Sequence, residues 1–265
     1  METKELPIYQ VDAFTPRLFA GNPAAVVLLE DWLSEGTMLS IAAESNLSET
    51  AFVIPGEGVC ELRWFTPATE MELCGHATLA AAHVLLSEFY PAREVVRFNA
   101  VSGPLSVRRD GERLTMDFPS RPGVPVEVTG EMTAALGARP EEALRASYLL
   151  AVFGDQEMVE RLDPDLTLVS ELDATAVIVT APGRECDFVS RFFAPSLGIP
   201  EDPVTGSAHC TLVPYWSRRL GLRRLNARQL SRRGGELMCE LKGGRVEMSG
   251  CAVTYMKGVI RVPES

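Results

Sequence analysis

Two stretches of the chain share one pattern of apolar and polar positions. In each, a short apolar strand ends at a Phe-x-Pro step, a loop carries acidic residues, and a Gly-x-Ala step opens a run with helical period. The first copy runs from Trp64 to Thr78 and the second from Phe192 to His209. Helices are predicted at 77–89 and 205–220, the second with a kink or early break at Pro214. The pattern indicates that one structural unit has been used twice.

Alternation and turn signals predict the remaining elements. Strands are expected at 6–13, 25–29, 50–54, 60–65, 105–107, 114–118, 148–153, 174–180 and 188–193, with four short strands between 227 and 262. Further helices are expected at 35–45, 129–136, 141–146 and 156–162. The Pro- and Gly-rich stretch at 119–125 cannot continue a sheet interior. It therefore divides an N-terminal lobe, 1–118, from a C-terminal lobe, 119–252.

The charge balance narrows the class of partner. The chain has 265 residues, 46% hydrophobic and 23% charged, which is ordinary for a globular protein, and its net charge is −11. Such a charge repels nucleic acids and anionic membrane surfaces on average, so a small-molecule partner is expected. The start of the chain lacks the basic end and apolar core of a targeting signal, and no apolar run approaches the roughly 18 residues of a membrane span. We therefore predict a cytoplasmic protein.

Arginines are concentrated in one segment of this acidic chain. Seven of them lie between Arg218 and Arg233. The simplest interpretation is a solvated helix end and loop that balance nearby acids. A dimer contact or charge steering of an acidic substrate are the alternatives.

The positions of the cysteines and histidines indicate whether disulfide bonds or a metal site are expected. The six cysteines are scattered without a Cys-x-x-Cys pair, so free, mostly buried thiols are expected. A zinc site could in principle form from four residues, Cys74, His76, His209 and Cys210. Neither half of this set has the usual zinc-ligand spacing, so no metal site is predicted.

The two Gly-x-Ala steps mark the expected substrate site. A helix start presents unpaired backbone N–H groups and a positive dipole end. Two such starts brought face to face across a cleft between the lobes would hold an anionic group from both sides. The substrate-binding residues expected on this basis are Gly75, Ala77, Gly206 and Ala208.

Two residues of the N-terminal lobe could transfer protons. Glu49 enters an apolar strand, and desolvation of a carboxylate brings its protonation toward neutral pH, as acid/base catalysis requires. The alternative is a surface glutamate at a strand end. His76 stands at a helix start, where the dipole disfavours the imidazolium, so a neutral ring is expected. A capping or core histidine is the alternative.

Asp202 and Ser207 flank the second Gly-x-Ala step, where a carboxylate and a hydroxyl could share one site. Alternatively, Asp202 caps the turn before Pro203 and Ser207 satisfies helix N–H groups. The chain contains no Gly-x-Ser-x-Gly elbow, Walker loop or dinucleotide fingerprint. Proton transfer without a cofactor is the chemistry that remains.

A set of motifs, in order along nearly the whole chain, resembles the phenazine-biosynthesis (PhzF-type) isomerase family. These motifs are Phe19-Ala-Gly-Asn-Pro-Ala-Ala-Val26, Asn46-Leu-Ser-Glu-Thr-Ala-Phe52, Leu73-Cys-Gly-His-Ala-Thr78, Arg191-Phe-Phe-Ala-Pro195, Glu201-Asp-Pro-Val-Thr-Gly-Ser-Ala-His209 and Arg233-Gly-Gly235. The resemblance implies an α+β protein of the diaminopimelate-epimerase fold. Such a protein has two pseudo-symmetric lobes, each a mixed sheet around a central helix, with the last strand, within 253–265, returning to the first lobe. It also implies a homodimer.

The resemblance also implies an activity and four catalytic residues. By motif, these residues are Glu49, His76, Asp202 and Ser207. The implied reaction is an isomerisation of a small cyclic or amino-acid-like carboxylate, in which the glutamate moves a proton. In the best-known member the substrate is a dihydro-hydroxyanthranilate.

Two other functions remain open. On the same fold, a racemase or epimerase can use a cysteine from each lobe, but aligning Gly75 with Gly206 places Cys74 opposite Thr205. Threonine is far too weak an acid to act as the second thiol base. The chain could also be a non-catalytic protein that binds small carboxylates.

Overall fold

The computed structural model describes residues 3–263. The chain divides into two compact units, Met1–Asp117 with Ser249–Ser265, and Phe118–Met248. We call them the N-terminal and C-terminal lobes. The boundary expected after residue 118 lies one residue beyond the observed one, and the segment that rejoins the N-terminal lobe begins at Ser249 rather than at 253.

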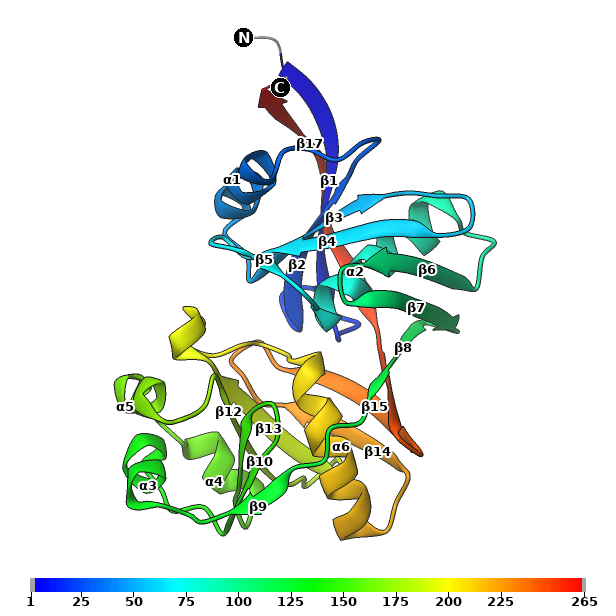
Figure 1. The fold of residues 1–265 in the computed structure, drawn as a ribbon. Helices are drawn as coiled ribbons and strands as arrows, with labels where there is room; N and C mark the ends of the chain where they lie inside the picture. The colour runs from blue at the N-terminus through cyan, green and yellow to red at the C-terminus, as the bar shows by residue number, and fades with distance from the viewer. Residues whose placement is uncertain (1–2, 264–265) are drawn as a thin grey trace. The chain divides into compact units, whose positions relative to one another are not determined.

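The N-terminal lobe is a mixed sheet around a buried helix (Figure 1). Its strands are β1 (Thr3–Ala13), β2 (Asn22–Leu28), β3 (Glu49–Ile54), β4 (Cys60–Phe65), β5 (Glu70–Met71), β6 (Val95–Ala100), β7 (Gly103–Asp110), β8 (Arg113–Pro119) and β17 (Ala252–Pro263). Its helices are α1 (Glu35–Ser45) and α2 (Gly75–Val84), which continues as the π-helical turn η1 (Leu85–Phe89). Helix α2 packs on β1, β2 and β3, and nearly all its side chains are buried because the sheet curves around it.

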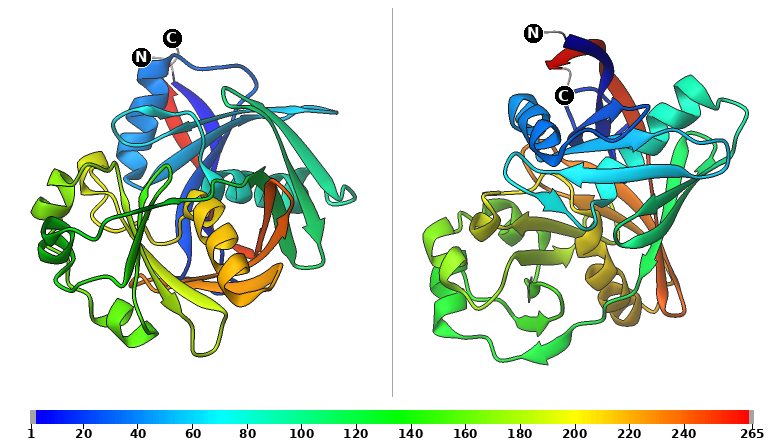
Figure 2. Two further views of the ribbon diagram at one scale, coloured as in Figure 1. Left: turned by 60° about the horizontal axis from the view of Figure 1, so that its bottom comes forward. Right: turned by 45° about the horizontal axis from the view of Figure 1, so that its top comes forward.

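The last strand completes the N-terminal sheet. Strand β17 pairs antiparallel with β1 over almost its whole length, with Val262 opposite Lys4 and Ala252 opposite Ala13. The expected return of the last strand to the first lobe is therefore confirmed. In both views of Figure 2 the two strands, at the blue and red ends of the colour scale, run side by side.

The C-terminal lobe is a mixed sheet with helices on both faces. Its strands are β9 (Val124–Val126), β10 (Glu142–Arg145), β11 (Leu149–Val152), β12 (Val177–Pro182), β13 (Phe188–Phe193), β14 (Arg224–Gln229), β15 (Gly235–Lys242) and β16 (Arg245–Gly250). Its helices are α3 (Gly130–Leu136), α4 (Gln156–Arg161), α5 (Leu166–Glu171) and α6 (Gly206–Leu220), and a 3-10 turn, η2 (Pro195–Leu197), follows β13.

Alternation along the strands separates the two packed faces of this sheet. Val177 and Val179 of β12 point into the core that α3, α4 and α5 cover. Thr180 and Phe188 point to the other face, where they contact Trp216 of α6: the Phe188 and Trp216 rings stack at 5.8 Å, and the indole N–H donates to Thr180 Oγ1 at 2.9 Å. Helix α6 is thereby fixed on β13 and its neighbours.

The structure differs from the sequence-based prediction in several elements. The segment expected as a helix at 141–146 is strand β10, because Ala143 and Leu144 are buried and pair with both β9 and β11; tertiary pairing overrides helical propensity. Helix α5 was not predicted. Helix α6 extends to Leu220 as predicted and does not break at Pro214, since Tyr215 and Trp216 after it are buried. The last of the four strands expected to be short, β17, has 12 residues.

No helix within residues 3–263 is both long and apolar enough to cross a membrane.

Candidate active site

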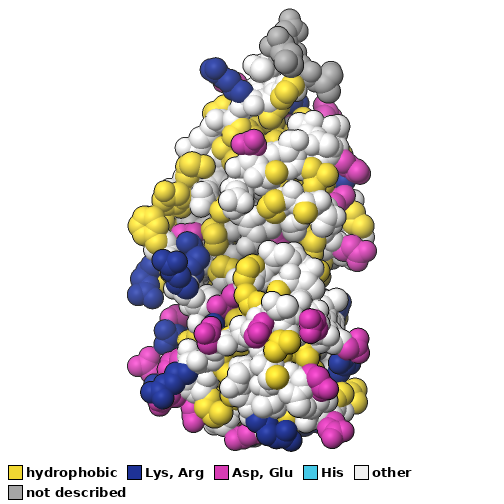
Figure 3. All heavy atoms as spheres, turned by 90° about the vertical axis from the view of Figure 1, so that its left-hand side faces the viewer, with side chains coloured by type: hydrophobic (Ala, Val, Ile, Leu, Met, Phe, Trp, Pro, Cys, Tyr) yellow, Lys and Arg dark blue, Asp and Glu magenta, His cyan; other side chains and the backbone are white. Residues whose placement is uncertain are grey.

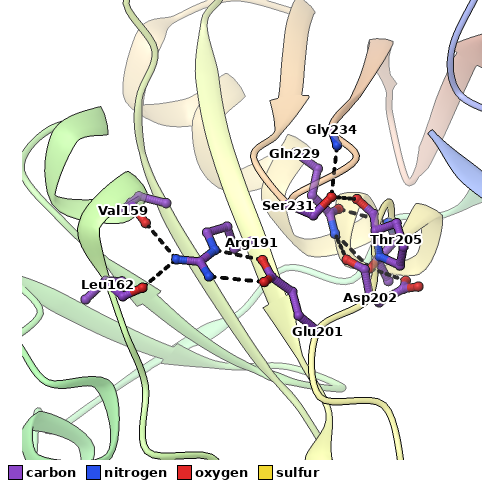
Figure 4. A network of polar contacts seen from close by, with 10 residues as sticks. Val159, Leu162, Arg191, Glu201, Asp202, Thr205, Gln229, Ser231 and Gly234 are labelled. Atoms are coloured by element: carbon purple, nitrogen blue, oxygen red, sulfur yellow. Dashed lines mark hydrogen bonds and ion pairs between the residues drawn. The ribbon is translucent and has the colours of Figure 1, made fainter. Parts of the chain in front are cut away.

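The internal repeat extends further than the apolar pattern indicates, to a matched ion pair in each lobe. Arg63 on β4 forms a bidentate pair with Glu70, at 2.6 Å for both contacts. Arg191 on β13 forms the same pair with Glu201, at 2.7 and 3.1 Å (Figure 4). Each glutamate lies five residues before the glycine that opens the helix. We call these two pairs the Arg–Glu clamps.

Each Arg–Glu clamp holds the loop that leads into the central helix of its lobe, α2 or α6. Bidentate pairing fixes the geometry of both partners. Arg191 also donates to the backbone oxygens of Val159, at 3.2 Å, and Leu162, at 2.7 Å, which ties its loop to the end of α4 (Figure 4). The Arg–Glu clamps could have been found in the sequence, because an arginine precedes the phenylalanine of Phe-x-Pro by two residues in both copies.

The equivalence of the two lobes continues into the first turn of each helix. Thr78 Oγ1 donates to the oxygen of Cys74 at 2.5 Å. His209, at the equivalent position of α6, bonds the oxygen of Thr205 through Nδ1 at 2.9 Å. In both lobes, therefore, a side chain in the first turn is bonded back to the residue that precedes the helix.

The N-terminal half-site contains Glu49, His76, Cys74 and Asn22. Glu49 and Asn22 begin the parallel neighbours β3 and β2, so both side chains reach the start of α2. Glu49 Oε2 lies 3.2 Å from His76 Nε2. On the other side of the ring, Nδ1 lies 3.2 Å from Asn22 Nδ2 and 3.5 Å from Cys74 Sγ. Glu49 and His76, both predicted as catalytic, are thus brought together.

The contacts of the ring indicate the protonation of His76. With the Asn22 amide nitrogen placed 3.2 Å from Nδ1, Nδ1 accepts and the ring proton lies on Nε2, facing Glu49. Burial lowers the pKa of His76 to about 3. The ring is therefore neutral, as expected from its position. The contact with Glu49 has hydrogen-bond length but is not aligned as one, a state common in ligand-free sites.

The C-terminal half-site is built around Asp202 and Gln229 (Figure 4). Thr205 Oγ1 donates to Asp202 Oδ2 at 2.5 Å. The buried amide of Gln229 accepts from the Thr205 N–H at 2.9 Å and donates to the Asp202 backbone oxygen at 2.7 Å. Gln229 thus holds both the residue before α6 and the backbone of Asp202.

Ser207, the other predicted residue of this half-site, has a different partner from the one expected. Its hydroxyl lies 3.1 Å from the Tyr148 hydroxyl, whereas the hydroxyl bonded to Asp202 is that of Thr205. The Tyr148 ring is held edge-on against Phe192 at 5.0 Å. Tyr148, like Gln229 and Asn22, was not predicted as a site residue, because its position before β11 carries no local signal of contact with α6.

The four predicted substrate-binding residues lie in the first turns of the helices. Gly75 and Ala77 begin α2, and Gly206 and Ala208 begin α6. No side chain caps either helix at Cys74 or Thr205. Both starts can therefore offer backbone N–H groups to an anionic ligand.

His209 provides a test of stability against pH. Burial lowers its pKa to about 4 from 6.5, although the bond to Thr205 opposes the shift. Between these two values the unfolded chain binds a proton that the folded chain does not, so the free energy of unfolding falls as the pH falls. We expect this residue to account for about 2 kcal/mol of the loss between pH 7 and 5.

The measurement is urea unfolding of the wild type and His209→Asn at both pH values, followed by circular dichroism. The variant, although less stable at pH 7, should lose about 2 kcal/mol less on acidification. The same pH dependence in both proteins would contradict the assignment.

The arginine-rich segment of α6 and the following strand balances nearby acids, as the simplest interpretation proposed. Arg219 pairs with Glu142 at 2.5 Å, and Arg228 pairs with Glu185 at 3.3 Å. Charges are also mixed elsewhere on the surface: on the face drawn in Figure 3, acidic and basic side chains are interspersed.

Comparison with known proteins identifies the family. A family model described as phenazine biosynthesis-like protein matches residues 11–258. An uncharacterized isomerase of Pseudomonas aeruginosa is 49% identical over 259 residues, which cover 97% of this chain and 99% of the relative. A crystal structure of a PhzF-family phenazine biosynthesis protein from Enterococcus faecalis matches with a TM-score of 0.95 at 47% identity, covering 97% of this chain and 99% of that one.

A more distant match shows how widely the fold is shared. A hydroxyproline epimerase from Agrobacterium vitis has a TM-score of 0.65 at 10% identity, covering 98% of this chain and 92% of that one. The fold is thus the epimerase-like α+β fold that the motifs implied. On the strength of the family model and the close relatives, the chain belongs to the phenazine biosynthesis-like (PhzF) family of isomerases.

Proposed function

We propose that this isomerase moves a proton within a small cyclic or amino-acid-like carboxylate by general acid/base catalysis, without a cofactor. The observation that carries the proposal is the pair formed by Glu49 and a neutral His76 at the start of α2. A buried carboxylate beside a polarising neutral donor is the arrangement that a proton-shuttling base needs.

In the proposed reaction, Glu49 removes a proton from a carbon next to an unsaturated bond of the substrate. The electron pair shifts along the conjugated system, and Glu49 returns the proton at another carbon, so no atom is gained or lost. His76, with its proton on Nε2, orients the carboxylate through the contact at 3.2 Å. The backbone N–H groups at the uncapped start of α2 bind the carboxylate of the substrate and any developing negative charge.

The proposal also assigns roles to two residues of the C-terminal lobe. Asp202 and Ser207 are assigned to hold or protonate the polar group of the substrate, with Tyr148 orienting the Ser207 hydroxyl at 3.1 Å. The hydroxyproline epimerase of the same fold has trans-4-hydroxy-L-proline bound, a small cyclic amino acid. That ligand supports the substrate class proposed here.

The experiment that tests the function is deuterium uptake in D₂O with a panel of cyclic β,γ-unsaturated amino and hydroxy acids. An acid/base isomerase incorporates solvent deuterium in an enzyme-dependent way. The matching methyl esters serve as controls, since they lack the carboxylate that the start of α2 binds. Ligand binding without label in any acid of the panel would favour the non-catalytic carboxylate-binding protein instead.

A racemase that uses two thiols is the second candidate on this fold, and Cys74 distinguishes it. Cys74 has Thr205 as its counterpart, and the Thr205 hydroxyl is bonded to Asp202 rather than poised as a base. We therefore expect Cys74→Ser to lower deuterium uptake less than tenfold, far less than a change at Glu49. A loss as large as that of Glu49→Gln would restore the thiol mechanism.

A further inference from the structure

Three side chains near the start of α2 carry different kinds of possible metal-ligand atoms. Ligand atoms of Glu49, Cys74 and His76 all lie within 4.8 Å of one another. All three side chains are buried, with 4 to 7% of each residue still exposed. We propose that this cluster is a binding site for a thiophilic divalent cation such as Zn²⁺, with Cys74 Sγ and His76 Nδ1 as its two anchoring ligands.

The distances match zinc coordination. Zinc binds thiolate sulfur at about 2.3 Å and imidazole nitrogen at about 2.0–2.1 Å, which places two such atoms about 3.5 Å apart on a tetrahedron. Cys74 Sγ and His76 Nδ1 are 3.5 Å apart. A cation can therefore be shared by these two atoms without movement of the backbone.

A third ligand is within reach on the same side of the ring. The Asn22 side-chain amide approaches Nδ1 to 3.2 Å, close to the separation of about 3.3 Å expected for oxygen and nitrogen ligands of zinc. Rotation of this amide about its last bond presents its oxygen in place of its nitrogen. The result is a sulfur, nitrogen and oxygen tripod with one open position.

Glu49 completes the arrangement from the opposite side of the ring. With a cation on Nδ1, the proton stays on Nε2, which faces Glu49 Oε2 at 3.2 Å. A carboxylate behind the metal-bound ring is the usual support of a zinc-ligating histidine. The charges also balance: two positive charges of the cation are met by the Cys74 thiolate and the Glu49 carboxylate.

The other cysteines are poorer candidates for a thiolate ligand. Burial raises the pKa of Cys210 to about 11 and also raises that of Cys239. Cys74 instead stands directly before α2, with its sulfur 3.5 Å from His76 Nδ1. Its binding of a cation would release the thiol proton to water. The four-residue zinc set considered from the sequence is thus replaced by a cluster within one lobe.

The test uses the full-length protein with a non-thiol reductant and Co²⁺ as a spectroscopic stand-in for Zn²⁺. We expect one Co²⁺ per chain, a near-ultraviolet thiolate-to-cobalt charge-transfer band, and bleaching of that band when Zn²⁺ is added. Cys74→Ser should abolish the band, and His76→Gln should weaken Co²⁺ binding at least tenfold. Glu49→Gln should weaken it about 10- to 100-fold and keep the band.

Cys186→Ser is the matched control, since this half-buried thiol lies in the C-terminal lobe, and it should leave the band unchanged. Melting temperatures establish that each variant is folded, and Cys74→Ala replaces Cys74→Ser if the latter is not. A band that persists without the Cys74 thiol, or a wild type that shows no band, would overturn the proposal. The readout needs no substrate, so its outcome is independent of the isomerase proposal.

Discussion

Replacing Glu49 with glutamine is expected to reduce deuterium uptake by about 10²- to 10⁴-fold, the usual contribution of a general acid/base. Glutamine keeps the size and polarity of the side chain beside His76 but cannot carry a proton between two carbons. Folding and ligand binding should remain close to those of the wild type. Isotope uptake by mass spectrometry and a melting curve measure the two effects separately.

The matched control is Glu72→Gln, which removes a carboxylate from an exposed position of the loop before α2. It should leave the exchange rate within a factor of two or so of the wild type, because surface charges are screened. Full activity of Glu49→Gln would remove the glutamate from its proposed role. Equal losses in both variants would indicate a general effect of charge.

Replacing Gln229 with methionine is expected to lower the free energy of unfolding by about 3 kcal/mol. The change leaves the Thr205 N–H and the Asp202 backbone oxygen buried without the partner they now share. Each buried polar group that loses its partner costs about 1–3 kcal/mol. Urea unfolding followed by circular dichroism measures the loss.

Two variants make this result specific. Gln229→Glu retains an acceptor for the Thr205 N–H and should be less destabilising than methionine if its carboxyl is protonated in place. Gln156→Met, which removes two exposed bonds, to Glu160 and to the Arg184 N–H, should cost less than about 1 kcal/mol. Equal stability of Gln229→Met and the wild type would show that the amide does not hold the Asp202 loop.

Periodicity along the chain determined most of the local structure, because burial of one face imposes a period that the sequence must show. Helix α1 and strands β4 and β13 have the bounds that were predicted, and Asn46 ends α1 with a positive φ of 49°. The repeat likewise predicted both central helices.

Prediction from the local sequence pattern was wrong where pairing with distant segments decides the structure. The segment 141–146 has helix-forming residues, yet it forms a strand because it pairs with β9 and β11. Helix α2 passes into a π-helical turn at Leu85, which no local signal in the sequence indicated.

The candidate site divides in the same way. The two helix starts could be predicted from the sequence, because a Gly-x-Ala step is local in the chain, and the four candidate catalytic residues came from motifs that resemble those of the family. How these residues are held could be read only from the tertiary structure: Asn22 contacts His76 Nδ1, and Gln229 bonds Asp202 from 27 residues away. Such partners leave no local trace, since a buried amide is selected by the geometry of strands that meet in space, and that geometry exists only once the sheet has formed.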